Sequence, residues 1–272
     1  MEGQIHNGDL LCTIDKNGVA TLALNQGDKF NAFDNHIIQL LITELNRLTH
    51  AANVRCLVLR GNGKHFSAGA DLNWMRSMAA KDYEENLADA SQLAELMHLL
   101  DSFPHPTIVY THGCAFGGAL GLICCCDIAI ADIDAVFSLS EVKLGLVPAT
   151  IGPYVCRAIG ARNTRRYVLT AERFDAQDAL KIGLVHFVTA PSTIDEKLSQ
   201  VIGQILANSP AAMTQAKALI HQCSEQPLDK ELIAYTSELI ANIRVSEQGQ
   251  EGLNAFLEKR DPVWHIGPKN AG

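Results

Sequence analysis

Glu141 and a cluster of glycines are the residues of this chain whose types and spacing could do chemistry. Gly113, Gly117, Gly118 and Gly121 fall within nine residues of one another. Closely spaced glycines let a backbone approach a ligand and present free N–H groups. Glu141 follows in an apolar setting, where burial would raise its pKa and make it a proton donor near neutral pH. Its expected apolar neighbours are Phe137, Leu139, Val142, Leu144, Leu146 and Val147.

A second segment of small residues, KHFSAGAD from Lys64 to Asp71, connects an expected strand to an expected helix. The N–H groups near Ala70 would lie at the helix N-terminus, where the helix dipole favours negative charge. Gly118 also follows a strand and begins a helix. Two such N–H groups aimed at one carbonyl oxygen would form an oxyanion hole. Each segment on its own is equally compatible with a tight turn or with close packing of a helix on a strand.

The glycine cluster does not match the common phosphate-binding motifs. No Gly-Lys-Ser/Thr sequence follows it, and Gly113 and Gly117 are separated by three residues, which excludes both a P-loop and G-x-G-x-x-G. The eight cysteines include no CxxC pair, and Cys and His are not clustered at zinc-ligand spacing. We therefore interpret the cysteines as reduced thiols of a cytoplasmic protein, and we expect no metal.

The composition is that of a soluble globular protein with a sizeable core. The chain has 272 residues, of which 47% are hydrophobic and 19% charged. Its net charge of −8 argues against nucleic acid as a partner. The N-terminus lacks the pattern of a signal peptide. Residues 106–126 carry no charge, but Pro106, His112 and the glycines interrupt them, so we expect no membrane span.

The order of the expected elements indicates an α/β body followed by helices. Asp9 to Leu24 reads as a hairpin around Lys16-Asn17-Gly18. Further strands are expected at 54–59, 107–110, 127–131, 136–139 and 184–188. Helices are expected at 33–48, from about 71, and at 82–100, 117–125, 151–159, 163–170, 175–181, 194–208, 210–223, 228–244 and 247–259. We expect residues 1–200 to form the core and residues 201–272 a helical region.

Four segments resemble the enoyl-CoA hydratase/isomerase (crotonase) superfamily: FSAGADL, GCAFGGALGL with CDIAIA, FSLSEVKLGLVP, and EGLNAFLEKR near the C-terminus. The resemblance covers nearly the whole chain, in the right order and at suitable spacing. It implies a crotonase-like spiral of β-β-α units with a C-terminal helical region. It also implies an acyl-CoA thioester as substrate, no separate cofactor, and self-association as a trimer or a dimer of trimers.

The resemblance also assigns residues. It implies that the N–H groups of Ala70 and Gly118 form the oxyanion hole and that Glu141 is the catalytic acid. The positions that would bind CoA are Lys64 near its phosphates, Ala68, Ala70, Asp71 and Leu72 around its adenine, and Phe256 and Lys259 in the tail, often for the site of a neighbouring subunit.

One departure from the family pattern concerns the reaction. Typical hydratases of the family carry a second catalytic glutamate, and Gly121 occupies its position here. Together with GADLNWM and PATIGPYV, this resembles a bacterial branch of 3-methylglutaconyl-CoA hydratases, which act in leucine degradation. Lys143 would then bind the distal carboxylate of the substrate, and the side chain missing at Gly121 would leave room for a branched β-carbon.

Other interpretations remain open from the sequence. A single glutamate at position 141 is also the arrangement of Δ3,Δ2-enoyl-CoA isomerases, and a non-catalytic binding protein of the same fold is a further alternative. In a hydratase, water would be held by Glu141 alone or by another polar group, for which His112 and Asn73 are candidates. Trp74, Met75 and Met78 are either walls of the acyl pocket or ordinary core.

Overall fold

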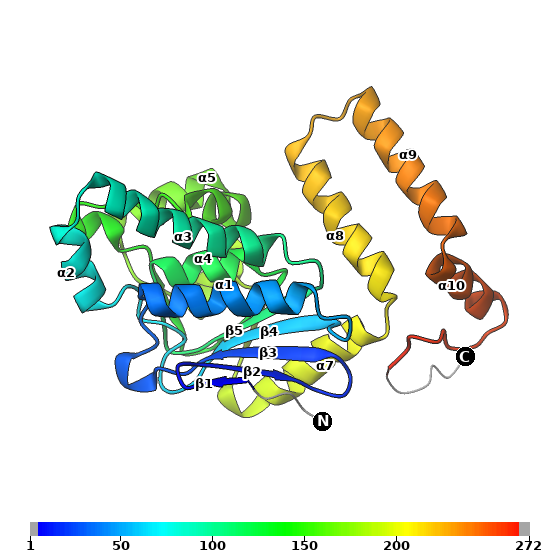
Figure 1. The fold of residues 1–272 in the computed structure, drawn as a ribbon, viewed down its shortest axis with the longest axis horizontal. Helices are drawn as coiled ribbons and strands as arrows, with labels where there is room; N and C mark the ends of the chain where they lie inside the picture. Colours follow the sequence, from blue (N-terminus) through cyan, green and yellow to red (C-terminus); the bar gives the residue numbers. More distant parts are fainter. Residues whose placement is uncertain (1–4, 267–272) are drawn as a thin grey trace. The chain divides into compact units, whose positions relative to one another are not determined.

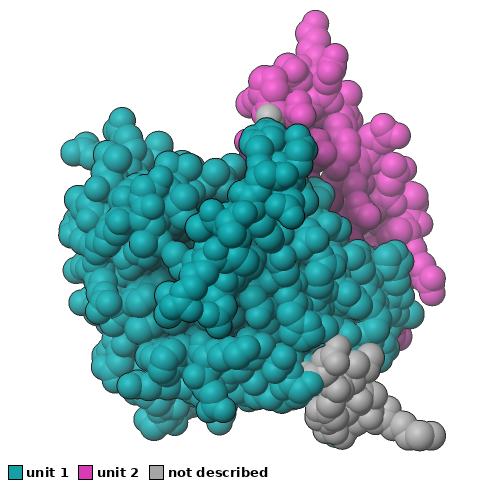
Figure 2. Space-filling model, turned by 60° about the vertical axis from the view of Figure 1, so that its left-hand side comes forward, with its two compact units in different colours: residues 1–103, 107–197 teal, residues 104–106, 198–272 magenta. Residues whose placement is uncertain are grey.

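The computed structural model describes residues 5–266 and divides the chain into two compact units (Figure 2). Unit 1 comprises Met1–Phe103 and Thr107–Lys197, and unit 2 comprises Pro104–Pro106 and Leu198–Gly272. Unit 1 contains both β-sheets, and unit 2 contains helices.

The main sheet of unit 1 has seven strands in the order β1-β2-β3-β4-β5-β7-β10. The strands are β1 (Ile5–Asn7), β2 (Leu10–Ile14), β3 (Val19–Leu24), β4 (Cys56–Gly61), β5 (Thr107–Thr111), β7 (Ile128–Asp132) and β10 (Phe187–Thr189). The first three pair antiparallel and the rest parallel. The predicted hairpin is confirmed, because Asp15 holds its turn and Gly18 has φ +83°.

A smaller sheet of three strands in the order β6-β8-β9 lies beside the glycine cluster. The strands are β6 (Cys114–Phe116), β8 (Val136–Ser138) and β9 (Phe174–Asp175). The sequence did not predict β6, which is only three residues long and is flanked by glycines. Gly113 precedes it with φ +57°, and a Cβ there would lie 2.2 Å from the carbonyl oxygen of Lys64. Only glycine fits this close approach of two chain segments.

In Figure 1, helices α1 (Asn35–Thr49), α3 (Tyr83–Asp101), α4 (Gly118–Cys125) and α5 (Gly152–Thr170) lie on one side of the main sheet. Unit 1 also contains α2 (Leu72–Ala80) and α6 (Ala176–Ile182). Asp34 caps α1 by accepting the N–H of Ile37 at 2.9 Å. Helix α1 packs against α3, α3 against α4, and α4 against α5. The two helices expected at 151–159 and 163–170 form one element that is broken at Gly160, where φ is +74°.

The C-terminal helices agree with the sequence patterns, the last expected strand is shorter than predicted, and β1, β9 and the short 3-10 helices were not predicted. The C-terminal helices are α7 (Ile194–Leu206), α8 (Pro210–Glu225), α9 (Lys230–Val245) and α10 (Glu247–Leu257), and the 3-10 helices are η1 (Gly27–Lys29), η2 (Glu141–Leu144) and η3 (Pro191–Thr193). The strand expected at 184–188 begins later, at Phe187, because Gly183 ends α6 in the left-handed region. Leu184 and Val185 are instead buried in the core.

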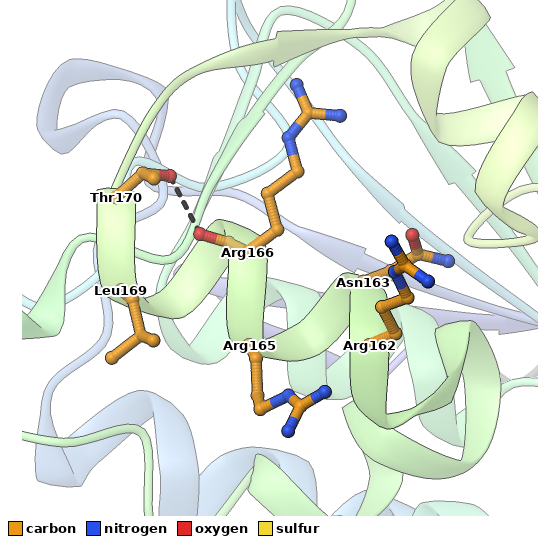
Figure 3. Close-up of a pocket in the computed structure, with 6 residues that line it drawn as sticks. All are labelled: Arg162, Asn163, Arg165, Arg166, Leu169 and Thr170. Atoms are coloured by element: carbon orange, nitrogen blue, oxygen red, sulfur yellow. Dashed lines mark hydrogen bonds between the residues drawn. The ribbon is translucent and has the colours of Figure 1, made fainter.

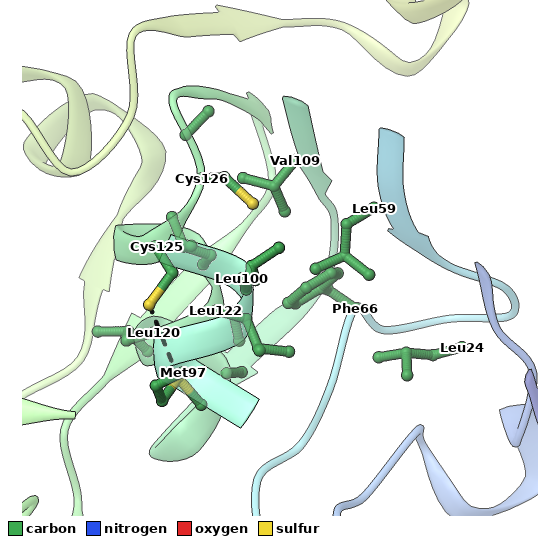
Figure 4. Close-up of a cluster of buried hydrophobic side chains, with 14 of the residues drawn as sticks. Leu24, Leu59, Phe66, Met97, Leu100, Val109, Leu120, Leu122, Cys125 and Cys126 are labelled. Atoms are coloured by element: carbon green, nitrogen blue, oxygen red, sulfur yellow. Dashed lines mark hydrogen bonds between the residues drawn. The ribbon is translucent and has the colours of Figure 1, made fainter. Parts of the chain in front are cut away.

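One continuous hydrophobic core joins the main sheet to its helices (Figure 4). Leu24, Leu59 and Phe66 meet side chains of α3 and α4 there. Residues 106–126, which are uncharged, are divided among β5, β6 and α4. None of the helices within residues 5–266 combines the length and the apolar character that a membrane span requires. All eight cysteines are free, in agreement with the sequence prediction.

Asp89 ties α1, α2 and α3 together from a buried position. Its carboxylate pairs with Lys81 at the end of α2, and its Oδ1 accepts a hydrogen bond from Asn35 Nδ2 at 3.0 Å. Burial alone would raise the pKa of Asp89, but the bonds from Lys81 and Asn35 lower it below its ordinary value. Helix α2 begins next to Ala70, so this ion pair also fixes a segment of the candidate site.

We expect Asp89→Ala to lower the free energy of unfolding by about 2–3 kcal/mol, because it leaves the Lys81 ammonium group half-buried without its partner. Lys181→Ala is the control, since its ion pair with Asp178 is largely exposed and contributes little to stability. Urea denaturation measures both variants. Equal losses would show that the Asp89 pair contributes no more than a surface pair.

Candidate active site

Two extended segments run side by side and end at the predicted oxyanion donors. Ser67 forms a parallel bridge with Ala115. Ala70 and Gly118 each lie three residues further along these segments, just after Gly69 and Gly117, whose positive φ angles turn the two chains. Gly69 has φ +95°, and a Cβ there would lie 3.2 Å from a carbonyl oxygen of the other segment. The small residues of both motifs therefore permit this approach.

The N–H group of Ala70 faces away from the segment that supports it. Phe33 donates its N–H to the Gly69 carbonyl at 2.7 Å, and its own carbonyl accepts the N–H of Asp71 at 2.8 Å. These bonds use the groups on either side of Ala70, so the N–H of Ala70 points to the opposite side. It takes part in no hydrogen bond within residues 5–266, and Ala70 is exposed. It is therefore available to a ligand.

Gly118 is the first residue of α4, where an N–H group has no partner inside the helix. Gly117 makes the turn into the helix with φ +55°, and it is anchored because its N–H donates to the Ser138 carbonyl at 3.0 Å. The ring of Phe33, which also supports Ala70, lies 3.7 Å from the place of a Cβ on Gly118. One aromatic residue thus positions both donors.

The carboxyl group of Glu141 lies beside this turn. Its Oε1 is 3.2 Å from the place that a Cβ on Gly117 would occupy, so only a glycine leaves ordinary space for it. Its Oε2 is buried and has no hydrogen-bond partner in the part of the chain that the structure describes. Burial raises the pKa of Glu141, although a hydrogen bond from its own backbone N–H acts in the opposite direction. A carboxyl group with a raised pKa therefore lies beside the turn that presents the N–H of Gly118.

The apolar setting expected for Glu141 is only partly correct. Phe137 and Leu139 are buried as expected. Leu144, Leu146 and Val147 are instead 59%, 52% and 70% exposed. They belong to η2 and the loop after it, which turn outward, whereas the preceding strand β8 turns into the core. The site is thus desolvated from the side of the core and open on the side of the loop.

The raised pKa of Glu141 predicts a pH-dependent effect on stability. The pKa of the Glu141 carboxyl is higher in the folded state than in the unfolded state, so folding favours its neutral form over its charged form. The stability that this preference contributes is complete at low pH, where the carboxyl is neutral in both states. This contribution is lost as the pH rises through the folded-state pKa. We therefore expect Glu141→Gln, which cannot ionise, to gain stability relative to the wild type over the pH range that begins near the ordinary glutamate pKa of about 4 and extends upward. Thermal melts of both proteins across this range measure the difference, and a constant difference would contradict the raised pKa.

Gly121 has no free space beside it, which overturns the expectation that its missing side chain leaves room for a branched substrate. A Cβ on Gly121 would lie 2.4 Å from Ile151 Cγ2 and 2.8 Å from Met97 Sδ. Ile151 is 2% exposed and Met97 is fully buried. These two apolar side chains therefore fill the volume that a side chain at position 121 would need.

Most of the residues predicted to bind CoA in unit 1 lie near Ala70 in the sequence. Lys64 is exposed and Ala68 partly buried in the connection from β4 to α2, and Leu72 is exposed as the first residue of α2. Asp71 caps α2 by accepting the N–H groups of Asn73 and Trp74 at 2.8 and 3.0 Å, so it also has a structural role. Lys143 is exposed on η2. Contact of these residues with CoA stays a prediction.

Phe256 and Lys259 belong to unit 2. Phe256, in α10, is 82% exposed. Lys259 has φ +54° in the turn that follows the helix. Their predicted part in the CoA site of a neighbouring subunit stays a prediction, and so does the assignment of functions to residues 1–200 and 201–272.

Each polar candidate for holding water has one atom engaged elsewhere, whereas His112 Nδ1 is buried without a hydrogen-bond partner in the described part of the chain. His112 Nε2 lies 2.9 Å from the Gly63 carbonyl oxygen. Asn73 Oδ1 accepts a hydrogen bond from Arg76 at 2.8 Å. Trp74 packs partly buried against the core, which favours the interpretation of this residue as core. No contact recorded within the described residues brings His112 or Asn73 to Glu141.

Sequence reasoning missed Phe33 and Ile151 as residues of the site. Phe33 was expected only as the start of a helix, and nothing in its neighbourhood signals contact with both donors. Ile151 lies in PATIGPYV, a departure from the family pattern that was noted without a structural meaning. Its contact with Gly121 joins positions 30 residues apart and appears only in the folded chain.

A separate pocket of about 720 Å³ lies on the C-terminal half of α5 (Figure 3). Its lining residues are Arg162, Asn163, Arg165, Arg166, Leu169 and Thr170. Arg166 is paired with Glu172 at 2.8 Å. None of the predicted site residues lines this pocket, so it is distinct from the candidate active site.

Known proteins are similar to this chain over most of its length. Residues 15–267 match the family model described as enoyl-CoA hydratase/isomerase. The 2,3-dehydroadipyl-CoA hydratase of Escherichia coli is 33% identical, over 90% of this chain and 94% of that protein. A putative enoyl-CoA hydratase of Thermus thermophilus is 31% identical, over 92% of this chain and 98% of that protein.

Solved structures show the same fold. The crystal structure of an enoyl-CoA hydratase from Shewanella pealeana superposes with a TM-score of 0.91 at 53% identity, over 94% of this chain and 96% of that chain. The predicted crotonase-like α/β fold with a C-terminal helical region is thus confirmed. The chain belongs to the enoyl-CoA hydratase/isomerase family.

Proposed function

We propose that this protein catalyses the reversible addition of water across the α,β double bond of an acyl-CoA thioester. The observation that carries the proposal is the carboxyl group of Glu141, with its raised pKa, beside the turn that leads into Gly118, whose N–H and that of Ala70 take part in no hydrogen bond within residues 5–266. Hydratase names among the relatives, at about 30% identity, support the same reaction.

In the proposed reaction, the N–H groups of Ala70 and Gly118 donate to the thioester carbonyl oxygen. Negative charge develops on this oxygen as water adds to the β-carbon, and each donor is worth roughly 10²–10³-fold in rate. Neutral Glu141 gives its proton to the α-carbon and takes a proton from the attacking water, whose hydroxyl group bonds to the β-carbon. The carboxyl group is neutral again at the end, so a single acid closes the cycle.

The substrate that we propose is 3-methylglutaconyl-CoA, which would place the protein in leucine degradation. Like the dehydroadipyl group named for the E. coli relative, this acyl group ends in a carboxylate. Lys143, exposed two residues after Glu141, offers a cation for it. Room at Gly121 no longer supports this choice, because Ile151 and Met97 fill it.

A comparison of turnover for 3-methylglutaconyl-CoA and crotonyl-CoA tests the substrate, with loss of the enoyl-thioester absorbance as the readout. We expect kcat/KM to be higher for 3-methylglutaconyl-CoA, and Lys143→Ala to reduce this preference mainly through KM. Preference for crotonyl-CoA would contradict the substrate assignment. Binding of acyl-CoA esters without turnover of any of them would instead identify a non-catalytic protein of the same fold.

Isomerisation is the second candidate, and the apolar packing at Gly121 favours it. An isomerase moves a proton between two carbons and needs one acid–base group but no water. Ile151 and Met97 occupy the place where a second carboxylate could hold a water molecule. The hydratase names of the relatives favour hydration instead. Incorporation of solvent oxygen into the product distinguishes the two reactions.

A further inference from the structure

Gly121 lies on the same face of α4 as the glycines at the start of the helix. Residues three and four apart in a helix share a face, and Gly121 follows Gly118 by three positions and Gly117 by four. The Glu141 carboxyl lies against Gly117. A side chain at position 121 would therefore begin about one helical turn, roughly 5 Å, along α4 from the turn that the Glu141 carboxyl contacts.

Ile151 blocks this position in a way that a rotamer change cannot relieve. A Cβ on Gly121 would lie 2.4 Å from Ile151 Cγ2, and also 2.9 Å from Ile151 Cβ. The Cβ atom is fixed by the backbone and does not move when the side chain rotates. That backbone is held at the N-cap of α5, where the Ile151 carbonyl accepts the N–H of Val155 at 3.0 Å.

Met97 closes the position from α3. Its Sδ would lie 2.8 Å from a Cβ on Gly121, and it also lies 3.9 Å from Cys125 Sγ, as the dashed line in Figure 4 shows. Met97 is fully buried among core side chains, so its flexible side chain can move aside only when a neighbouring side chain such as that of Ile151 is removed. Side chains from α3 and from the N-cap of α5 thus both pack against Gly121.

We propose that Ile151, supported by Met97, is a specificity-determining residue: it keeps position 121 without a side chain and so makes the site a single-acid site served by Glu141. The catalytic meaning of this inference rests on the proposed function, whereas the packing on which it depends does not. The exclusion of a side chain at position 121 depends on Ile151, so a side chain is accepted there only when Gly121 and Ile151 are replaced together.

A cycle of thermal melts tests the packing without any activity. Gly121→Ala should lower the melting temperature by roughly 3–10 °C, because the methyl group collides with Ile151 and Met97. Ile151→Gly should also lower it through lost packing, although glycine is tolerated at a helix N-cap. Adding Gly121→Ala to Ile151→Gly should then cost little or restore stability. An equal loss in both backgrounds would overturn the proposal.

The catalytic consequence is tested in the Ile151→Gly background. Gly121→Glu in that background should add a second ionisation to the pH profile of kcat/KM for an enoyl-CoA, whereas the matched Gly121→Gln should not. If Gly121→Glu alone, with Ile151 in place, folds stably and shows the second ionisation, Ile151 is not the restricting residue. Should the glutamate double variant fail to fold, the alanine cycle still decides. A wild type without turnover would refute the proposed function and leave the packing cycle intact.

Discussion

Replacing Glu141 by glutamine is expected to lower kcat for enoyl-CoA hydration by about 10²–10⁴-fold, the usual contribution of a positioned acid–base group. Glutamine keeps the shape of the side chain beside Gly117 but can neither give a proton to the α-carbon nor take one from water. The buried Oε2 has no partner in the described part of the chain, so no structural hydrogen bond is lost there. KM should change little, because the oxyanion donors are untouched.

Steady-state kinetics of Glu141→Gln measure this effect, and circular dichroism confirms that the variant is folded. Glu172→Gln is a suitable control, since Glu172 is exposed and pairs with Arg166 on α5, outside the candidate site. Turnover of Glu141→Gln within a few-fold of the wild type would remove Glu141 from the mechanism. The same loss in Glu172→Gln would point to a general effect of removing a carboxylate.

Replacing Gly118 by proline is expected to lower kcat by roughly 10²–10³-fold, because proline deletes one of the two N–H donors of the oxyanion hole. The first position of a helix tolerates proline, and no hydrogen bond within residues 5–266 uses this N–H. The loss should therefore appear in the rate rather than in stability. Both hydration and isomerisation should suffer, since both pass through charge on the thioester oxygen.

Gly118→Ala is the matched control, because alanine keeps the N–H. Its Cβ would lie 3.7 Å from the ring of Phe33, which is ordinary van der Waals contact. We expect Gly118→Ala to lose far less activity than Gly118→Pro, measured by kcat of both variants at similar melting temperatures. Equal losses would mean that bulk at this position, and not the hydrogen bond, explains the effect.

The sequence predicted the elements that carry the site better than it predicted the space between them. Strong local signals, such as the hairpin turn at Gly18 and the apolar spacing of α1, gave the correct elements because each depends on neighbouring residues. The three-residue strand β6 has no such signal. Its position depends on pairing with β8, which follows 20 residues later.

In the candidate site, too, the sequence predicted the residues better than it predicted their packing. Ala70, Gly118 and Glu141 were found from residue types and motifs, and the structure brings the segments that carry them together. The surroundings of Glu141 were half wrong, because an apolar run in the sequence does not tell which residues turn outward. The sequence could not predict that the space beside Gly121 is occupied, because the side chains of Met97 and Ile151 that occupy it come from distant parts of the chain.

The most direct test of the proposed hydration is isotopic. The protein is incubated with 3-methylglutaconyl-CoA in water labelled with ¹⁸O, and the acyl-CoA products are analysed by mass spectrometry. We predict a hydroxyacyl-CoA that carries one ¹⁸O atom, formed by the wild type and nearly absent with Glu141→Gln. A product with a shifted double bond and no ¹⁸O would contradict hydration and identify the protein as an isomerase.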